Sequence, residues 1–241
     1  MKSWNKSSTS RRSLMKLGIF GVSGMVIAGI PGMLNAQSMS RGKTLTFNAD
    51  DIGILNFALL LEELESAFYA AVVIAGKVTN SKELEYMRYF GSQEAAHVTF
   101  LRKVLANQVL FTTQDLIFNQ AGLEGILGSR DRILNAAIIL EDLGVHAYNG
   151  AGTGLTNPTF LLAAGSIVSV EARHAAGVRS LLGRSATEPD GDRFISDENL
   201  NASINPFKGK AYDELYTPKQ IVAILGSLNI LDNPITGSLV T

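Results

Sequence analysis

Two copies of the spacing Glu-x-x-His are the most informative feature of this 241-residue chain. The first pairs Glu94 with His97 and the second pairs Glu171 with His174, so two of the three histidines in the chain take part. Positions i and i+3 lie on the same face of an α-helix. A carboxylate and an imidazole placed in this way can bind one metal ion, and two such pairs that face each other can bind two.

Apolar residues at helical spacing predict four long helices that would position these pairs. The expected helices cover about residues 50–77, 81–107, 129–150 and 157–183. The middle of each apolar seam carries a group that is costly to bury ionised and unpaired. The first and third helices supply one Glu each, and the second and fourth supply Glu-x-x-His. The six candidate metal ligands are Glu62, Glu94, His97, Glu141, Glu171 and His174.

The four carboxylates in this set would repel one another and raise their own pKa values unless cations neutralised them. Two divalent metal ions would offset four negative charges, and neutral imidazoles would complete the ligand shells. Mixed oxygen and nitrogen ligation favours iron or manganese over magnesium and does not exclude zinc. The alternative is a buried hydrogen-bond network without metal. One Glu-x-x-His pair is a weak signal, but six candidates in four seams favour the metal site.

The rest of the chain predicts appendages to one helical domain. Residues 49–183 form the expected four-helix bundle, and residues 37–48 form a linker before it. A stretch without long helical period, about residues 107–129, is too long for a tight turn and predicts a crossover between the second and third helices. Residues 184–241 predict a loop-rich extension with a short helix from about Pro218 to Leu225. No strand alternation supports a sheet, so the expected fold class is all-α.

Residues 1–36 have the pattern of an export signal. Paired Arg11 and Arg12 precede an apolar, glycine-rich run that ends in small residues at Ala36. The paired arginines resemble the twin-arginine signal, which predicts export of the folded protein by the twin-arginine translocation machinery to the periplasm or cell envelope. The alternative is a membrane anchor that stays attached, but the run is interrupted by Gly21, Gly24, Gly29, Pro31 and Gly32, which argues against a permanent span.

The composition excludes several other classes of protein. The chain holds 21 Lys and Arg against 22 Asp and Glu, and without residues 1–36 it holds 16 cations and 22 anions. This acidic balance argues against a nucleic-acid partner. The absence of cysteine excludes a disulfide scaffold, a thiolate zinc site and a cysteine nucleophile.

Four further residues lie near the candidate ligands in sequence. Glu65 follows Glu62 by one turn and is interpreted as a charge at the edge of the bundle, with a second ligand as the alternative. Tyr69 and Tyr148 lie two turns after Glu62 and Glu141, where a phenol could hydrogen-bond a ligand or take part in one-electron chemistry, or only pack. His146 is interpreted as a surface residue or an outer neighbour of the site.

From Asp50 to Gly183 the chain resembles the ferritin-like superfamily. The resemblance rests on the order of the candidate ligands along the chain, which is one Glu, Glu-x-x-His, one Glu and Glu-x-x-His. Segment 55–62, together with Glu171 and His174, is closer to exported bacterial ferritin-like proteins related to plant desiccation-associated proteins. The resemblance implies two iron or manganese ions, with Glu94 and Glu171 as bridges and the other four ligands terminal.

The resemblance implies a metal site more firmly than an activity. The chemistry expected of such a centre is oxidation of metal by O2 or peroxide, or peroxide removal, in keeping with a role in oxidative stress. The main alternative is a non-catalytic stress or desiccation protein of the envelope, in which the metals only hold the bundle together. An electron-transfer partner is a third alternative, but the chain has no iron-sulfur or haem motif. The export signal and the long C-terminal extension argue against storage of metal in a hollow shell of many chains. A smaller homo-oligomer is compatible with the sequence.

Overall fold

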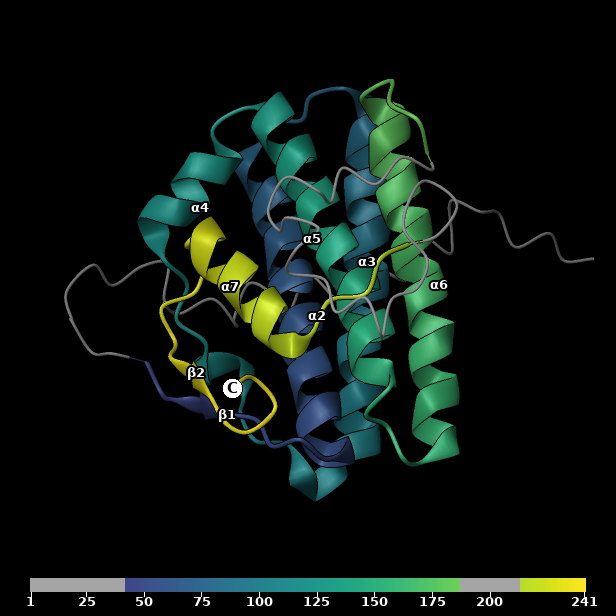
Figure 1. Ribbon diagram of the computed structural model, residues 1–241. Helices are drawn as coiled ribbons and strands as arrows, with labels where there is room; N and C mark the ends of the chain where they lie inside the picture. The colour runs from purple at the N-terminus through teal and green to yellow at the C-terminus, as the bar shows by residue number, and fades with distance from the viewer. Residues whose placement is uncertain (1–41, 187–212) are drawn as a thin grey trace, which may run out of the picture.

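The computed structural model of the chain describes residues 42–186 and 213–241. Four long helices form a bundle, and a shorter helix near the C-terminus packs beside it (Figure 1), which confirms the predicted all-α fold class. The predicted export signal and residues 37–41 of the predicted linker lie outside the described residues. None of the helices in the described ranges is both long enough and apolar enough to cross a membrane.

The bundle helices are close to the predicted ranges. They are α2 (Asp51–Ala75), α3 (Ser81–Leu105), α5 (Arg130–Gly152) and α6 (Pro158–Leu181). Each begins at a side-chain cap that accepts a backbone N–H, from Asp50, Asn80, Ser129 and Asn157 respectively. Helix α3 begins at Ser81, the predicted first residue, and Asn80 is its cap. The helices pair as α2 with α3 and as α5 with α6, and the two pairs face each other.

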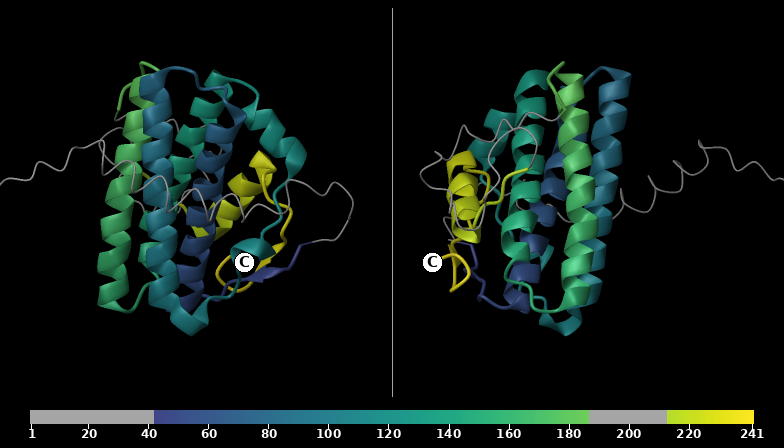
Figure 2. Two further views of the ribbon diagram at one scale, coloured as in Figure 1. Left: turned by 180° about the vertical axis from the view of Figure 1, so that it is seen from behind. Right: turned by 45° about the vertical axis from the view of Figure 1, so that its right-hand side comes forward.

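Helix α2 lies at the centre of the molecule, whereas α3 lies at its outside (Figures 1 and 2). Every residue of α2 from Gly53 to Glu65 is buried, and this segment is apolar on almost all sides. In α3 the buried residues follow a single seam, at Met87, Phe90, Glu94, Leu101 and Leu105. The difference arises because further elements cover the face of α2 that points away from the bundle.

The crossover between α3 and α5 contains more regular structure than the sequence predicted. It holds two short 3-10 helices, η2 (Ala106–Gln108) and η3 (Thr113–Asp115), and the helix α4 (Gln120–Leu127). Two glycines lie inside α4, and they hid its helical period from sequence analysis. Together with the C-terminal helix α7, helix α4 lies on the side of α2 opposite to α6 (Figure 1).

The C-terminal extension returns to the start of the bundle. Helix α7 (Pro218–Leu228) begins at the predicted residue, with Thr217 as its cap, but runs three residues past the predicted end. Strand β2 (Ile235–Thr236) then pairs in parallel with β1 (Leu45–Thr46), and this small sheet corrects the expectation of no strand. With only two residues each, the strands are too short to show an alternating pattern. The extension therefore covers α2 and secures the chain just before the bundle.

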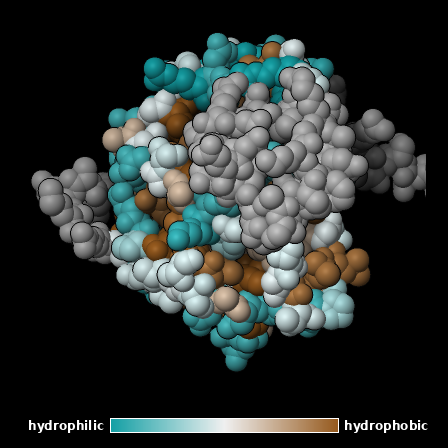
Figure 3. Space-filling model, viewed as in Figure 1, coloured by the Kyte–Doolittle hydropathy of each residue, from teal (hydrophilic) through white to brown (hydrophobic). Residues whose placement is uncertain are grey.

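Two apolar clusters divide the interior along the bundle axis. One contains Leu55 and Leu60 of α2 and Leu101 of α3, and the other contains Val72 of α2 and Met87 of α3. In α3, α5 and α6 the predicted ligands fall between the residues that belong to the two clusters. The bundle therefore holds a polar layer between two apolar ones. At the surface, outside the grey atoms, hydrophobic residues form small groups among hydrophilic ones (Figure 3).

Candidate metal centre

The six predicted ligands meet in the polar layer at the middle of the bundle. All four carboxylates are fully buried, and the His174 side chain is 2% exposed, whereas that of His97 is 13% exposed. Four helices contribute, so residues up to 112 positions apart in the chain, Glu62 and His174, belong to one cluster. The structure thus brings together all six residues that were predicted as ligands from their positions in the apolar seams.

The cluster consists of two overlapping groups of four residues. Within each group, one ligand atom per residue can be chosen so that all four lie within 4.8 Å of one another. Both groups contain Glu94 and Glu171. The first adds Glu62 and His97, and the second adds Glu141 and His174. Each group is therefore suited to one cation, and two acids belong to both.

Glu94 faces both histidines with different oxygen atoms. Its Oε2 lies 3.0 Å from Nδ1 of His97, and its Oε1 lies 2.7 Å from Nδ1 of His174. Nδ1 of His97 also lies 3.0 Å from Oε2 of Glu62 and 3.1 Å from Oε1 of Glu171. One ring nitrogen can form only one good hydrogen bond, so three carboxylate oxygens at this distance exceed what it can satisfy. A cation among these atoms would satisfy them all.

Gln93 sets the tautomer of His174. Nε2 of His174 lies 2.6 Å from Oε1 of Gln93, and because an amide oxygen only accepts, Nε2 donates. In the neutral ring, Nδ1 then presents its lone pair toward Glu94 and Glu141, at 2.7 and 3.3 Å. This is the arrangement of a metal-binding imidazole whose other nitrogen is held by a neighbouring acceptor. Gln93 was not among the residues predicted from the sequence, although it directly precedes Glu94.

The pKa values of the acids show how much charge the cluster must balance. Burial raises the pKa of Glu62 and of Glu171 to about 8 and that of Glu141 to about 7, against the effect of the histidines. Burial would also raise the pKa of Glu94, but the adjacent imidazoles of His174 and His97 outweigh it and lower the value to about 2. Without a cation, the other three acids thus hold protons that they would not hold in water.

The pKa values of the two histidines show that the acids also stabilise positive charge. Burial favours neutral rings, but the adjacent carboxylates of Glu171, Glu62 and Glu94 overcome it and raise the pKa of His97 to about 12. In the same way, the carboxylates of Glu141 and Glu94 raise the pKa of His174 to about 10. Two positive charges are therefore held at the centre of the acids even without metal.

Several buried atoms of the cluster lack a hydrogen-bond partner among the described residues. They include one oxygen each of Glu94 and Glu141, both oxygens of Glu171, and Nδ1 of His174. The short distance between Nδ1 of His174 and Glu94 is thus not a hydrogen bond in its geometry. Unpaired buried polar atoms are costly and call for an explanation. Oxygen and nitrogen atoms that converge without partners fit a metal site by position and by chemistry.

Two tyrosines bind the acids of the opposite helix. The hydroxyl of Tyr69 in α2 donates to Oε1 of Glu141 in α5, and that of Tyr148 in α5 donates to Oε1 of Glu62 in α2. Burial raises both tyrosine pKa values well above their usual range, and the contacted acids add to the effect, so the hydroxyls keep their protons. Of the roles considered from the sequence, hydrogen bonding to a candidate ligand is the one observed.

Two interpretations of residues near the site were wrong. Glu65 is 3% exposed and lies inside the bundle, not at its edge. Burial raises its pKa well above the usual range, and Glu171 and Glu62 add to this effect. His146 is 4% exposed and not a surface residue; burial, together with nearby Arg179, lowers its pKa to about 4. Its ring packs against Tyr216, so the C-terminal extension covers it.

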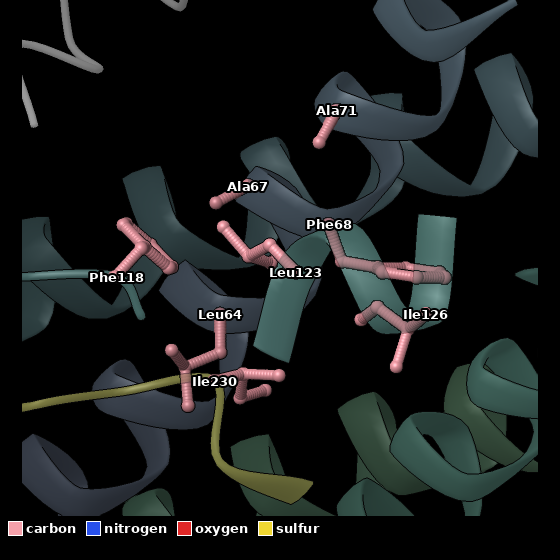
Figure 4. A pocket seen from close by; sticks show the side chains of 8 residues that line it. All are labelled: Leu64, Ala67, Phe68, Ala71, Phe118, Leu123, Ile126 and Ile230. Atoms are coloured by element: carbon pink, nitrogen blue, oxygen red, sulfur yellow. The ribbon is translucent and has the colours of Figure 1, made fainter. Parts of the chain in front are cut away.

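The apolar pocket on the other side of α2 has no such chemistry. It lies between α2, α4 and the chain after α7 (Figure 4). Its lining side chains are all apolar, so it offers no group for catalysis or metal binding. They are Leu64, Ala67, Phe68, Ala71, Phe118, Leu123, Ile126 and Ile230.

Residues 50–184 match the family model of the ferritin-like domain, which is more than half of the chain. The chain belongs to this family. No curated protein and no solved structure matches the chain. The ferritin-like domain accounts for the four bundle helices and for a buried Glu and His cluster that can hold metal, while the extension after residue 184 lies outside the matched region.

Proposed function

We propose that this ferritin-like protein binds two iron or manganese ions and uses them to react with O2 or peroxide. The observation that carries the proposal is the pair of overlapping four-residue groups that share Glu94 and Glu171. These two acids would bridge the ions. Glu62 and His97 would complete one site, and Glu141 with His174 the other. When bound, iron or manganese supplies the electrons that reduce O2 or peroxide.

The residues around the ligands support this role. Tyr148 and Tyr69 hold the carboxylates of Glu62 and Glu141 in place by donating hydrogen bonds. Gln93 holds His174 with the lone pair of Nδ1 toward the acids. The apolar clusters on either side keep bulk water away and strengthen the electrostatic interactions within the layer. The protein thus arranges its ligands before any metal arrives.

The two groups differ in access. The group with His97 is the less buried, because His97 is partly exposed whereas all members of the other group are buried. Tyr148, which contacts Glu62 of the same group, also lines an apolar groove between α2, α5 and α6. We infer that the small, apolar O2 molecule reaches the centre on this side.

The test is the metal content of the purified full chain, followed by its consumption of O2 and H2O2 after loading with iron or manganese. We expect two ions per chain and turnover that disappears in Glu94→Gln and Glu171→Gln. A chain that binds neither metal after folding in its presence would end the proposal.

The rival proposal is a non-catalytic protein of the cell envelope in which the metals only stabilise the bundle. The complete burial of the His174 group favours it, since a structural site needs no access. The same two variants separate the proposals. If they lower the melting temperature of the metal-loaded chain and the wild-type chain shows no turnover to lose, the metals are structural.

We also propose export through the twin-arginine pathway, on the paired Arg11 and Arg12 before the apolar run. Export of a folded protein would let the metals be inserted before translocation. Cell fractionation of the wild type and of the variant Arg11→Lys/Arg12→Lys tests this. We expect the wild type in the periplasm or envelope and the variant in the cytoplasm, and the same location for both would contradict export by this route.

A further inference from the structure

Glu65 is a fifth buried carboxylate at the metal centre, outside the six ligand candidates. It lies one helical turn after Glu62 on the same face of α2 and is 3% exposed. Its Oε2 atom has no hydrogen-bond partner among the described residues. An unpaired carboxylate at this depth is costly, so its presence requires a physical reason.

A neighbouring acid shows how such a residue is normally accommodated. Glu63 is also buried, but its Oε1 binds Arg102 at 2.5 Å and accepts a hydrogen bond from Thr113 at 3.0 Å. No ion pair of Glu65 with a cationic side chain is present within residues 42–186 and 213–241. The carboxylate of Glu65 therefore lacks the compensation that Glu63 has.

Gly144 leaves space for this carboxylate. A Cβ atom at Gly144 would lie 3.1 Å from Oε1 of Glu65 and 3.4 Å from Oε2 of Glu171. Gly144 follows Glu141 by three residues in α5, so it lies on the face that points to the metal centre. A side chain here would press on Oε1 of Glu65 and would also contact Glu171. By contrast, a Cβ at Gly165 of α6 would have no neighbour within 4 Å.

On the basis of the proposed dinuclear centre, we infer that Glu65 is a seventh ligand, whose free carboxylate oxygen binds one of the two metal ions. This accounts for its burial, its unpaired oxygen and the space at Gly144. Glu65 also brings a fifth negative charge to the centre, whereas two divalent ions offset only four carboxylates. Ions that can reach a higher charge, such as iron and manganese, would balance five acids better than zinc does.

Cobalt(II) titration of the metal-free full chain tests the role of Glu65, because cobalt reports both affinity and the number of ligands by its visible absorption. We expect Glu65→Gln to fold normally and to weaken one of the two binding steps by about 10- to 100-fold. Its absorption should also change as the metal loses a ligand. The surface variant Glu85→Gln, which removes the same charge outside the centre, should match the wild type in both respects.

Two further variants keep the test independent of folding. Glu65→Leu should raise the melting temperature of the metal-free chain, because it removes an uncompensated buried acid, while it weakens cobalt binding. A purely structural Glu65 would show a lower melting temperature and unchanged binding. Gly144→Ala should weaken binding by crowding Glu65 and Glu171, whereas the matched Gly165→Ala should not.

The outcomes separate this inference from the proposed function. If the wild type binds two cobalt ions and Glu65→Gln binds them with the same affinity and spectrum, Glu65 is not a ligand and the dinuclear centre stands. If the wild type binds no cobalt, the role of Glu65 falls together with the dinuclear centre.

Discussion

The Tyr148 hydroxyl of α5 donates a hydrogen bond to Oε1 of Glu62 in α2, over a distance of 2.5 Å. In the reciprocal hydrogen bond, the Tyr69 hydroxyl of α2 donates to Oε1 of Glu141 in α5. Each tyrosine follows the acid of its own helix by seven residues but contacts the acid of the other helix. The two central helices are therefore tied to each other twice, through the acids that we assign as terminal ligands.

Replacement of either tyrosine should destabilise the metal-free chain. Tyr148→Phe leaves the buried Glu62 without its donor, and we expect the free energy of unfolding to fall by about 1–3 kcal/mol. Tyr69→Phe is the matched variant for Glu141 and should cause a similar loss. Urea unfolding followed by circular dichroism measures both. Two variants as stable as the wild type would show that the hydroxyls do not hold the acids.

Metal binding should release protons and become tighter as the pH rises. In the metal-free chain, burial raises the pKa of Glu62 and Glu171 to about 8, and hydrogen bonds to acids, outweighing burial, raise that of His97 to about 12. At neutral pH a metal ion must displace these protons. Manganese affinity should therefore increase between about pH 6 and pH 8. Calorimetric titration in buffers of different protonation enthalpy detects the released protons, and an affinity independent of pH would count against the assigned ligands.

The raised pKa values of Glu62 and Glu171 also determine how the stability of the metal-free chain depends on pH. The raised carboxyl pKa values of Glu62 and Glu171 return to about 4.5 on unfolding, so the unfolded chain binds fewer protons between these values. The contribution of these acids to stability is therefore present below about pH 4.5 and is lost as the pH rises through about 8.

The six ligand candidates could be predicted because helical periodicity alone places them at the centre of apolar seams. The role of Glu65 could not be predicted, because its burial depends on α5, where Gly144 leaves space beside it. The cover on the outer face of α2 could not be predicted either. Two glycines hide the helical period of α4, and strands of two residues each have no pattern of their own. Gln93 and Gly144 were missed because their roles depend on neighbours distant in sequence.

His146 should make the chain sensitive to mild acid. Burial, with the nearby charge of Arg179, lowers its pKa from 6.5 to about 4, so the unfolded chain takes up a proton between these values and the folded chain does not. His146 therefore does not change the free energy of unfolding above about pH 6.5, and it lowers this free energy by about 2 kcal/mol at pH 5. His146→Gln should lose about that much less stability than the wild type between pH 7 and pH 5 in urea unfolding. Equal losses in both chains would exclude His146 as the source.

The apolar groove that Tyr148 lines should control how fast oxidant reaches the centre. Ala151 of α5 lines the groove and is only half-buried, so a larger side chain there fills it with little strain on the core. Ala151→Leu should slow O2 consumption several-fold and leave the number of bound metal ions unchanged. Stopped-flow kinetics of the iron-loaded chain measures the rate. An unchanged rate would mean that O2 enters elsewhere, for example beside the partly exposed His97.

The most direct measurement is the number of manganese or iron(II) ions that the metal-free full chain binds under anaerobic conditions. The two overlapping groups of buried ligands predict two ions per chain in the wild type. Glu94→Gln and Glu171→Gln should each weaken both sites, since both groups share these acids. One ion or none in the wild type, or loss of only one site in both variants, would contradict a dinuclear centre bridged by Glu94 and Glu171.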